Sequence, residues 1–399
     1  MFRISVPPPL SLYVHFPWCV RKCPYCDFNS YTLQGELEER RYVEALQKDL
    51  EAQATQVPGR EVISIFFGGG TPSLFSPDAI GRVMESVRRH FTVTADLEVT
   101  MEANPGAIEH GRFGEYRAAG LTRVSLGAQS FDEQRLGLLG RIHSPDETRR
   151  AAAELHAAGL DNFNLDLMYA LPGQDVRAAV RDVEEALALE PVHISHYQLT
   201  IEHGTVFAAQ PPSLPEDDAA ADMFAECAER LSEAGYSHYE VSAYARPERR
   251  SRHNLNYWTF GDYLGIGAGA HGKLTTSAGI FRTQQLREPR RYLASVPDGV
   301  SRTEVVPGQL PFEFMLNALR LVDGFDLSLF PARTGLDWGA VAAAVDRLVG
   351  RGLLMRQETR LKPSPLGLQF LNDVLLSFVV DQRRQSAKMT GAFGLSTTS

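Results

Sequence analysis

Six short runs rich in β-branched and aromatic residues recur in the first half of the chain. They are "LYVHF" from Leu12, "VISIFF" from Val62, "LEVTME" from Leu97, "RVSLGAQ" from Arg123, "NFNLDLMY" from Asn162 and "HISHYQLT" from His193. Between them, segments 38–53, 76–91, 146–160 and 175–190 carry apolar residues at helical spacing behind an acidic or serine start. This alternation, with a period of about 30 residues, predicts a parallel sheet with right-handed crossovers. The predicted fold class is α/β, with the sheet either open or curved into an incomplete barrel.

Polar or glycine residues end four of these runs, where a strand interior would carry apolar side chains. The endings are "FFGGGTP", "TMEANPG", "LGAQSF" and "NLDLMYALPG". In open sheets and in barrels, chemistry gathers at the carboxyl ends of parallel strands. We therefore expect Glu102, Gln129 and Asp166 to converge on one mouth, together with whatever follows the first strand.

The chain has 399 residues, a net charge of −9 and 44% hydrophobic residues, which is typical of a globular protein of two or three domains. A net negative charge does not provide the excess of Lys and Arg that binds nucleic-acid phosphates, so we expect no nucleic-acid partner. The N-terminal "MFRISVPPPLSLYVHF" has no signal-like apolar run, and no window approaches the roughly 20 apolar residues of a membrane span. We expect a cytoplasmic protein. The sequence leaves open whether it associates peripherally with a membrane and which oligomeric state it adopts.

The strand and helix rhythm fades after about residue 205. A loop, "QPPSLPEDD", is followed by a helix, the strand-like "HYEVSAYA" and the glycine-rich "GDYLGIGAGAHGK". From Pro307 the expected order is helix, helix, β-hairpin, helix, which is winged-helix-like. This part carries as many acidic as basic residues, which favours an interaction or lid module over DNA binding. The expected units are a partial barrel at 1–205, a barrel extension at 206–306, this module at 307–380 and a disordered tail at 381–399.

Three of the four cysteines, Cys19, Cys23 and Cys26, follow the first predicted strand with the spacing C-x3-C-x2-C. In a reducing compartment such a group indicates a metal site rather than a disulfide framework. Soft thiolates select zinc or iron–sulfur clusters. A 4Fe–4S cluster normally takes four cysteines, so three leave one iron with an open position. We expect the fourth cysteine, Cys227, to be a buried and inert thiol on a helical face.

This spacing after an N-terminal strand, with Tyr25 before the last cysteine, resembles the signature of the radical S-adenosylmethionine (radical SAM) superfamily. The resemblance implies an incomplete (β/α)6 barrel and a 4Fe–4S cluster on the three cysteines. It also implies S-adenosylmethionine, whose methionyl moiety chelates the open iron. The similarity covers roughly residues 10 to 378 and includes a C-terminal winged-helix-like α+β module. A zinc loop with a distant fourth ligand is the alternative.

Further motifs resemble the HemN-like subgroup of that superfamily. "GGGTP" from Gly68 is similar to the glycine turn whose backbone approaches the methionyl amino group. In that subgroup an acidic residue after the third strand, Gln after the fourth, Arg in a "GRIH"-like segment and Asp in a "DL-x-Y-x-LPGQ"-like segment line the cofactor pocket. The amide and carboxylate side chains suit ribose hydroxyls, and the arginine suits a carboxylate. The resemblance implies these cofactor-binding residues: Tyr13, Tyr25, Gly69, Gly70, Thr71, Glu102, Gln129, Arg141 and Asp166.

Two kinds of protein share this layout, the oxygen-independent coproporphyrinogen oxidases and the HemW-type haem chaperones. The oxidase motif continues to a further cysteine where this chain has Phe28, which speaks against an active oxidase. "HNLNYW" from His253 is similar to the His-Asn-x-x-Tyr-Trp motif of the HemW group, and offers His253 and Tyr257 as haem-binding residues.

The HemW resemblance implies a protein that binds haem and passes it to client haemoproteins, and it assigns no catalytic residue. Two alternatives stay open. One is a radical enzyme of the oxidase type, and the other is a redox-sensing protein whose C-terminal module recruits a partner. The haem ligand is likewise open between His253, Tyr257 and a displaced cluster cysteine.

Overall fold

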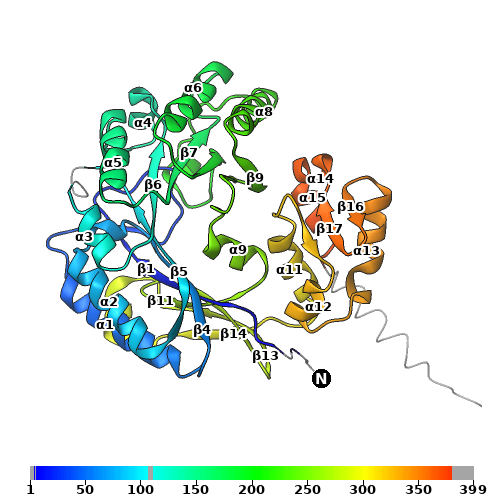
Figure 1. Ribbon diagram of the computed structural model, residues 1–399, viewed down its shortest axis with the longest axis horizontal. Helices are drawn as coiled ribbons and strands as arrows, with labels where there is room; N and C mark the ends of the chain where they lie inside the picture. Colours follow the sequence, from blue (N-terminus) through cyan, green and yellow to red (C-terminus); the bar gives the residue numbers. More distant parts are fainter. Residues whose placement is uncertain (1–3, 5, 107–110, 380–399) are drawn as a thin grey trace, which may run out of the picture.

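The computed structural model describes residues 4, 6–106 and 111–379 of the chain. Six parallel strands lie side by side in chain order within a twelve-stranded sheet (Figure 1). They are β1 (Leu10–Phe16), β4 (Glu61–Gly69), β5 (Thr92–Ala103), β6 (Arg123–Gln129), β7 (Phe163–Tyr169) and β8 (His193–Gln198). Each strand falls on one of the six predicted runs, which confirms the α/β prediction. The two edge strands of the described sheet do not pair with each other, so the barrel is incomplete.

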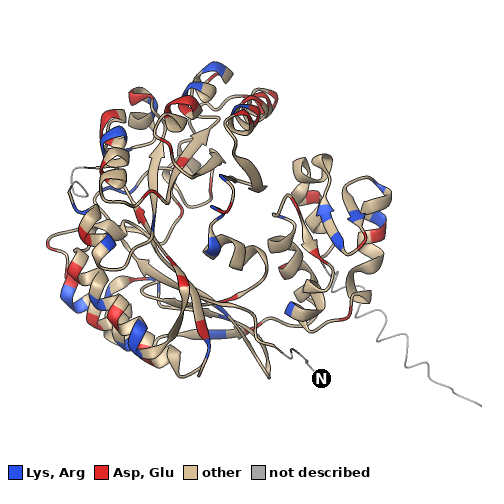
Figure 2. Cartoon of the chain, viewed as in Figure 1, with Lys and Arg blue, Asp and Glu red and all other residues tan. Residues whose placement is uncertain are grey.

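Helices cover the outer face of this curved sheet, as Figure 1 shows. They are α1 (Glu39–Ala54), α2 (Pro77–His90), α3 (Phe113–Ala118), α4 (Glu133–Leu138), α5 (Pro145–Ala157), α6 (Val176–Leu187) and α8 (Asp217–Glu233). Capping fixes where four of them begin, because the side chains of Ser76, Asp132, Ser144 and Asp175 accept hydrogen bonds from backbone N–H groups of the first turn. Charged residues gather on these outer helices (Figure 2), while their apolar faces pack on the strands.

Cys227 lies on the buried face of α8 with no exposed surface, as predicted, and burial raises the pKa of its thiol to about 12. The thiol therefore stays protonated at neutral pH, and a protonated, enclosed thiol is neither a nucleophile nor a metal ligand.

The sheet extends beyond both sides of the six parallel strands, which periodicity alone does not indicate. Next to β1 lies a further parallel strand, and three antiparallel strands follow it: β11 (Asp262–Ile266), β12 (His271–Thr276), β13 (Gly279–Gln284) and β14 (Ser301–Glu304). Next to β8 lie two antiparallel strands, β10 (Ala243–Ala245) and β9 (Ser237–Glu240). The glycine-rich run makes the first extension possible, since a Cβ on Gly265 would lie 2.0 Å from the carbonyl oxygen of His271.

The "HNLNYW" motif forms a helix, α9 (Arg252–Trp258), which lies in the hollow of the curved sheet (Figure 1). The Ser251 hydroxyl caps this helix, and the Glu98 carboxylate of β5 accepts hydrogen bonds from the backbone N–H groups of Arg252 and His253 at 3.0 and 3.2 Å. Shorter elements complete this part of the chain: β2 (Trp18–Cys19), β3 (Tyr31–Thr32), the 3-10 turn η1 (Pro72–Leu74), α7 (Val206–Ala209) and α10 (Pro289–Ser295).

The C-terminal module is built around a second apolar core, in which Phe314 packs edge-on against Phe325 and Phe330 and which also includes Phe260 and Ile280 from the preceding part of the chain. It comprises α11 (Leu310–Ala318), β15 (Phe325–Asp326), α12 (Leu329–Thr334), α13 (Gly339–Gly350), β16 (Leu354–Gln357), β17 (Arg360–Pro363), α14 (Pro365–Gln369) and α15 (Leu371–Leu376). The predicted helix, helix, β-hairpin and helix are present as α11, α13, β16–β17 and α15, and the structure adds β15, α12 and α14, which were not predicted. The ion pair Arg320–Glu240, at 2.9 Å, joins the module to the rest of the chain.

No helix in the described part of the chain is long and apolar enough to cross a membrane. The tail expected at 381–399 lies outside the described residues.

Candidate functional site

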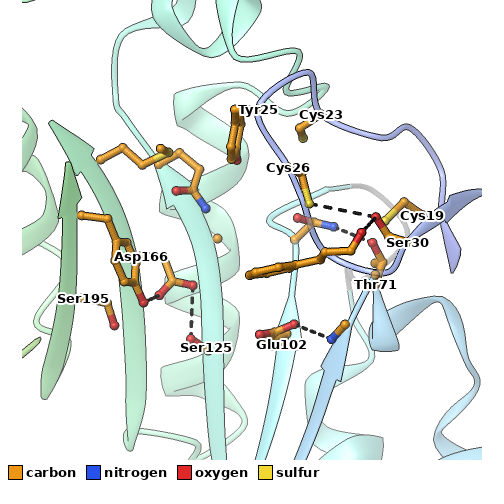
Figure 3. A pocket seen from close by; sticks show the side chains of 18 of the residues that line it. Cys19, Cys23, Tyr25, Cys26, Ser30, Thr71, Glu102, Ser125, Asp166 and Ser195 are labelled. Carbon is orange, nitrogen blue, oxygen red and sulfur yellow. Dashed lines mark hydrogen bonds between the residues drawn. The ribbon is translucent and has the colours of Figure 1, made fainter. Parts of the chain in front are cut away.

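A cavity of about 630 Å³ lies inside the curved sheet, and Glu102, Gln129 and Asp166 all line it. Figure 3 shows Glu102 and Asp166 on its wall. One end is made by Cys19, Cys23, Cys26, the Gly69–Thr71 turn and Arg141, and we call it the cluster end. The other end is made by Arg123 and His253 with Glu98 behind them, and we call it the histidine end. The two ends are separated along the strands, because Arg123 begins β6 and Gln129 ends it. Glu102, Gln129 and Asp166 thus line one cavity, as expected from their positions at the strand ends.

The cysteine loop is held in shape by its own backbone and by a distant part of the sheet. Its ends pair as β2 and β3, and Cys26 N donates a hydrogen bond to Cys23 O at 3.2 Å. Lys22 Nζ donates to the carbonyl oxygens of Phe28 and Ser30, both at 3.0 Å. The side chain of Asn29 donates to Ala268 O at 3.0 Å. All three cysteines consequently line one cavity, where burial raises the pKa of the Cys19 and Cys26 thiols.

The donor set of this loop fits an iron–sulfur cube. Three soft sulfur ligands line a cavity large enough for a cluster and a small molecule. Within the described ranges, no three His, Cys, Asp or Glu side chains surround one point closely enough to hold a single metal ion. A cube does not need that arrangement, because each thiolate binds a different iron. The residues present are thus suited to a 4Fe–4S cluster with one iron free of protein ligands.

The glycine turn after β4 packs directly against the start of the cysteine loop. Gly70 N donates to Phe16 O at 2.6 Å, and Thr71 N donates to Trp18 O at 2.7 Å. A Cβ on Gly70 would lie 2.5 Å from the carbonyl oxygen of Trp18, so only glycine permits this approach. Gly69 has φ +117°, and its N–H donates to Glu102 Oε2 at 3.0 Å. The turn therefore links the cysteine loop to the carboxylate of β5.

Two half-buried carboxyl groups, those of Glu102 and Asp166, share the middle of the cavity. Burial, and then the negative charge of Asp166, raise the pKa of Glu102 to about 8. Burial also raises the pKa of Asp166, although its oxygens accept hydrogen bonds from Asn164 Nδ2 at 2.7 Å and Ser125 Oγ at 3.2 Å. At neutral pH Glu102 is therefore mostly protonated in the free protein. A cationic or hydrogen-bond-donating group that enters the cavity favours its ionised form.

Arg141 links the cysteine loop to the end of β6. It follows α4, and its guanidinium donates to Gly127 O at 2.8 Å and lies 3.7 Å from Cys23 Sγ. Nearby, Gln129 has φ +67°, in the left-handed region that non-glycine residues rarely adopt. A strained backbone at a strand end that lines a cavity is typical of a binding site.

Three tyrosines named from the sequence differ in whether they reach the cavity. Tyr25 lines the cavity and packs near Phe207, with ring centroids 6.4 Å apart. Tyr13 is not among the residues that line the cavity; its hydroxyl bonds with His15 Nδ1 at 2.8 Å. Tyr257 also lies behind the wall, edge-on to Tyr263 with centroids 4.8 Å apart. Of these three tyrosines, only Tyr25 directly contacts the cavity.

His253 is 5% exposed and lines the cavity at the histidine end. Its ring stacks on Phe66 with centroids 4.3 Å apart, and its Nδ1 lies 3.0 Å from Glu98 Oε1. Burial lowers the pKa of His253, so the ring is neutral at pH 7 and Nδ1–H donates to the carboxylate. Burial opposes ionisation of Glu98, but the hydrogen bond from His253 and the nearby charge of Arg123 bring its pKa to about 2. The imidazole is thereby fixed in one orientation.

Several cavity residues were not named from the sequence. Asn104, Ser125, Asn164 and Ser195 line the cavity and bond to the residues above, and Arg123 lines it as well. Some of them carry a signal in the sequence, because polar residues alternate at i and i+2 inside two otherwise apolar strands, in "RVSLG" and "NLD". Such alternation places polar side chains on the inner face of a barrel.

Comparisons with known proteins agree with this site. The profile of the Radical SAM superfamily matches residues 13–186, and that of the HemN C-terminal domain matches residues 307–370. The chain is 47% identical to the heme chaperone HemW of Escherichia coli (strain K12), over 94% of this chain and 99% of that protein. It is 42% identical to the heme chaperone HemW of Haemophilus influenzae, with the same coverage of both chains.

Among solved structures, coproporphyrinogen III oxidase (HemN) from Escherichia coli superimposes with a TM-score of 0.79 at 23% identity, over 94% of this chain and 91% of that one. At this level of identity the likeness shows that the two chains share a fold, including the C-terminal module.

Proposed function

Because this chain belongs to the radical SAM superfamily and, within it, to the HemW family, we propose that it binds haem and delivers it to client haemoproteins. One observation carries the proposal: His253, from the motif that first suggested haem, lines the same cavity as the three cysteines. Membership of the superfamily also implies a 4Fe–4S cluster and S-adenosylmethionine. We place both at the cluster end of this cavity.

At the cluster end, Cys19, Cys23 and Cys26 hold the cluster. The backbone of Gly69 and Gly70, with Thr71, faces the methionyl group of the cofactor, and Glu102 accepts a hydrogen bond from its amino group. This division of roles is supported by the bond between Gly69 N and Glu102 Oε2, at 3.0 Å.

Arg141 pairs with the carboxylate of the cofactor, which its place 3.7 Å from Cys23 Sγ supports. Gln129 and Asp166 bond the ribose hydroxyls, and Tyr25 covers the loop side of the pocket. Tyr13 is a positioning residue, because its hydroxyl bonds His15 Nδ1 and its side chain lies behind the wall.

At the histidine end, His253 would supply its imidazole to the haem iron. A neutral imidazole whose other nitrogen donates to a carboxylate is the usual arrangement of a histidine metal ligand, because the carboxylate fixes the tautomer and raises the basicity of the ring. Glu98 is that carboxylate, 3.0 Å from Nδ1. Tyr257, packed near His253 with ring centroids 6.2 Å apart, supports the ring from behind.

Haem titration of the anaerobically reconstituted protein tests the proposal. We expect a Soret shift that saturates in wild type and weakens at least about ten-fold in His253→Ala, with His90→Ala on the outer helix α2 as the control. His253→Gln is the sharper variant, because its amide still donates to Glu98 but does not ligate haem iron. A full Soret shift in both His253 variants would exclude His253 as the ligand, and no shift in wild type would refute the haem proposal.

The shared fold makes radical decarboxylation of a porphyrinogen the competing activity. Phe28 occupies the position of the further oxidase cysteine and is 57% exposed. We expect no decarboxylated product from coproporphyrinogen incubated with reductant, S-adenosylmethionine and the reconstituted protein. Product formation, measured by mass spectrometry, would favour the oxidase.

A further inference from the structure

Arg123 is a buried arginine whose side chain has no hydrogen-bond or ion-pair partner among the residues that the structure describes. It begins β6, is 2% exposed, and lines the cavity at the histidine end. Its Nε is fully enclosed and unpartnered. A guanidinium carries five N–H donors and is always charged, so burying it without partners is strongly unfavourable.

The two carboxylates near Arg123 accept no hydrogen bond from its guanidinium. Arg123 lies opposite Thr100 in the pairing of β6 with β5, so Glu98 is two residues away along the neighbouring strand, and the positive charge of Arg123 lowers the pKa of both Glu98 and Asp166. The oxygens of Glu98, however, already accept from the backbone N–H groups of Arg252 and His253 and from His253 Nδ1. Those of Asp166 accept from Ser125, Asn164 and Tyr197. The donors of Arg123 are left for something that enters the cavity.

We propose that Arg123 binds a carboxylate of the transported ligand, a propionate side chain of haem. The inference rests on the proposed function. It adds a residue that recognises the edge of the haem, where the propionates are, in addition to the residue that binds the iron. The planar guanidinium matches a carboxylate with two parallel hydrogen bonds. Arg123 and the proposed iron ligand His253 line the same cavity, and Glu98, which lies 3.0 Å from His253 Nδ1, stands two residues from the β5 residue opposite Arg123.

The carboxylate of S-adenosylmethionine is the other anion that this cavity would receive. The cluster end already holds an arginine for it, because Arg141 lies 3.7 Å from Cys23 Sγ. Arg141 donates to Gly127 O near the end of β6, whereas Arg123 begins that strand. The cavity thus has one arginine for each carboxylate-bearing ligand.

Esterified haem tests the inference without any substitution. Haem and haem dimethyl ester share the iron and the macrocycle, but the ester has no carboxylate. We expect reconstituted wild type to bind haem about ten- to one-hundred-fold more tightly than the ester, which corresponds to a charge-assisted hydrogen-bond pair. Equal affinities would overturn the role of Arg123 and leave haem binding intact. Absence of a Soret shift with either compound would instead refute haem binding itself, and this inference with it.

Two variants assign the preference to Arg123. Arg123→Gln should bind haem and its ester equally, and Arg123→Lys should retain part of the preference, because it keeps the charge but not the two-pronged geometry. Arg149→Gln, on the outer helix α5, is the control and should behave as wild type. Binding of S-adenosylmethionine should be unchanged in all three variants. Weaker cofactor binding in Arg123→Gln with the haem preference preserved would assign Arg123 to the cofactor carboxylate and overturn the proposal.

Discussion

The two ends of the cavity are built in different ways. At the cluster end, Cys19, Cys23 and Cys26 stand on a partly exposed loop, and Arg141 follows a short helix. At the histidine end, Arg123 and Glu98 stand on strands, and His253 on a helix enclosed by the sheet; all three are less than 10% exposed. The first end presents ligands from a loop on a rigid scaffold, and the second is part of the scaffold itself.

This difference suggests that the ends work separately. A loop can exchange its cluster without rearranging the strands, whereas the histidine end holds its shape through buried hydrogen bonds such as that between His253 Nδ1 and Glu98 Oε1, at 3.0 Å. A chaperone that must accept and release haem needs a pocket that is present before the ligand arrives. A change at one end should therefore leave ligand binding at the other end intact.

Removing the cluster ligands should have the largest effect and should be confined to the cluster end. With Cys19, Cys23 and Cys26 all changed to alanine, we expect no cluster, because each thiolate holds one iron. We expect the haem affinity to stay within about three-fold of wild type, a change of under about 1 kcal/mol in the free energy of binding. Iron and sulfide analysis with a haem titration measures both. Cys227→Ala removes a thiol from the core and should keep the full cluster.

If haem binding disappears together with the cluster, the two ends are coupled and the comparison fails. Zinc in the wild-type protein, or a cluster that survives the triple change, would contradict the assignment of the cysteines.

The fold and the cluster end were largely predictable because both depend on local sequence. The six strands and the longer outer helices α1, α2, α5, α6 and α8 follow from hydrophobic period and capping, whereas the short helices α3 and α4 were not predicted; the cysteine spacing is contained within one loop. The consecutive glycines in the sequence likewise indicate the tight Gly69–Thr71 turn, and the turn packs against the cysteine loop.

The histidine end was only partly predictable because it depends on contacts between distant segments. His253 was named from a motif, but its partner Glu98 is 155 residues away, and nothing near either residue indicates the other. Arg123 stands in a run that predicts a strand, and burial of its charge becomes visible only once the sheet is curved. The pairing of β11 with β1 likewise joins segments about 250 residues apart and has no local signal.

Adding one methyl group at the glycine turn should disturb the cluster end by a smaller amount. In Gly70→Ala the new Cβ would meet Trp18 O at 2.5 Å, so we expect a loss of about 1–3 kcal/mol in the free energy of unfolding and weaker binding of S-adenosylmethionine. The matched control is Gly81→Ala in α2, where the nearest atom lies 3.8 Å away and the helix should gain up to about 1 kcal/mol.

Urea unfolding with cofactor titration measures both variants. Unchanged stability in Gly70→Ala would show that the turn is not tightly packed on the loop, and a changed preference between haem and its ester would show that the disturbance reaches the histidine end.

Glu102 lies between the ends and should give the smallest effect, a pH dependence of cofactor binding. Its pKa is raised to about 8, so below that pH the free protein holds it protonated, and only the ionised form is a pure acceptor for the amino group of the cofactor. Binding therefore releases a proton, and affinity for S-adenosylmethionine should rise about three- to ten-fold from pH 6.5 to pH 8. Glu102→Gln keeps the acceptor oxygen but does not titrate, so its pH profile for cofactor affinity should be flatter by that amount.

Haem affinity should not follow this profile in either protein, because Glu98, with a pKa of about 2, stays ionised throughout. Parallel pH profiles for the two ligands in calorimetric titrations would mean that one titrating group serves the whole cavity, and the division into two ends would be wrong.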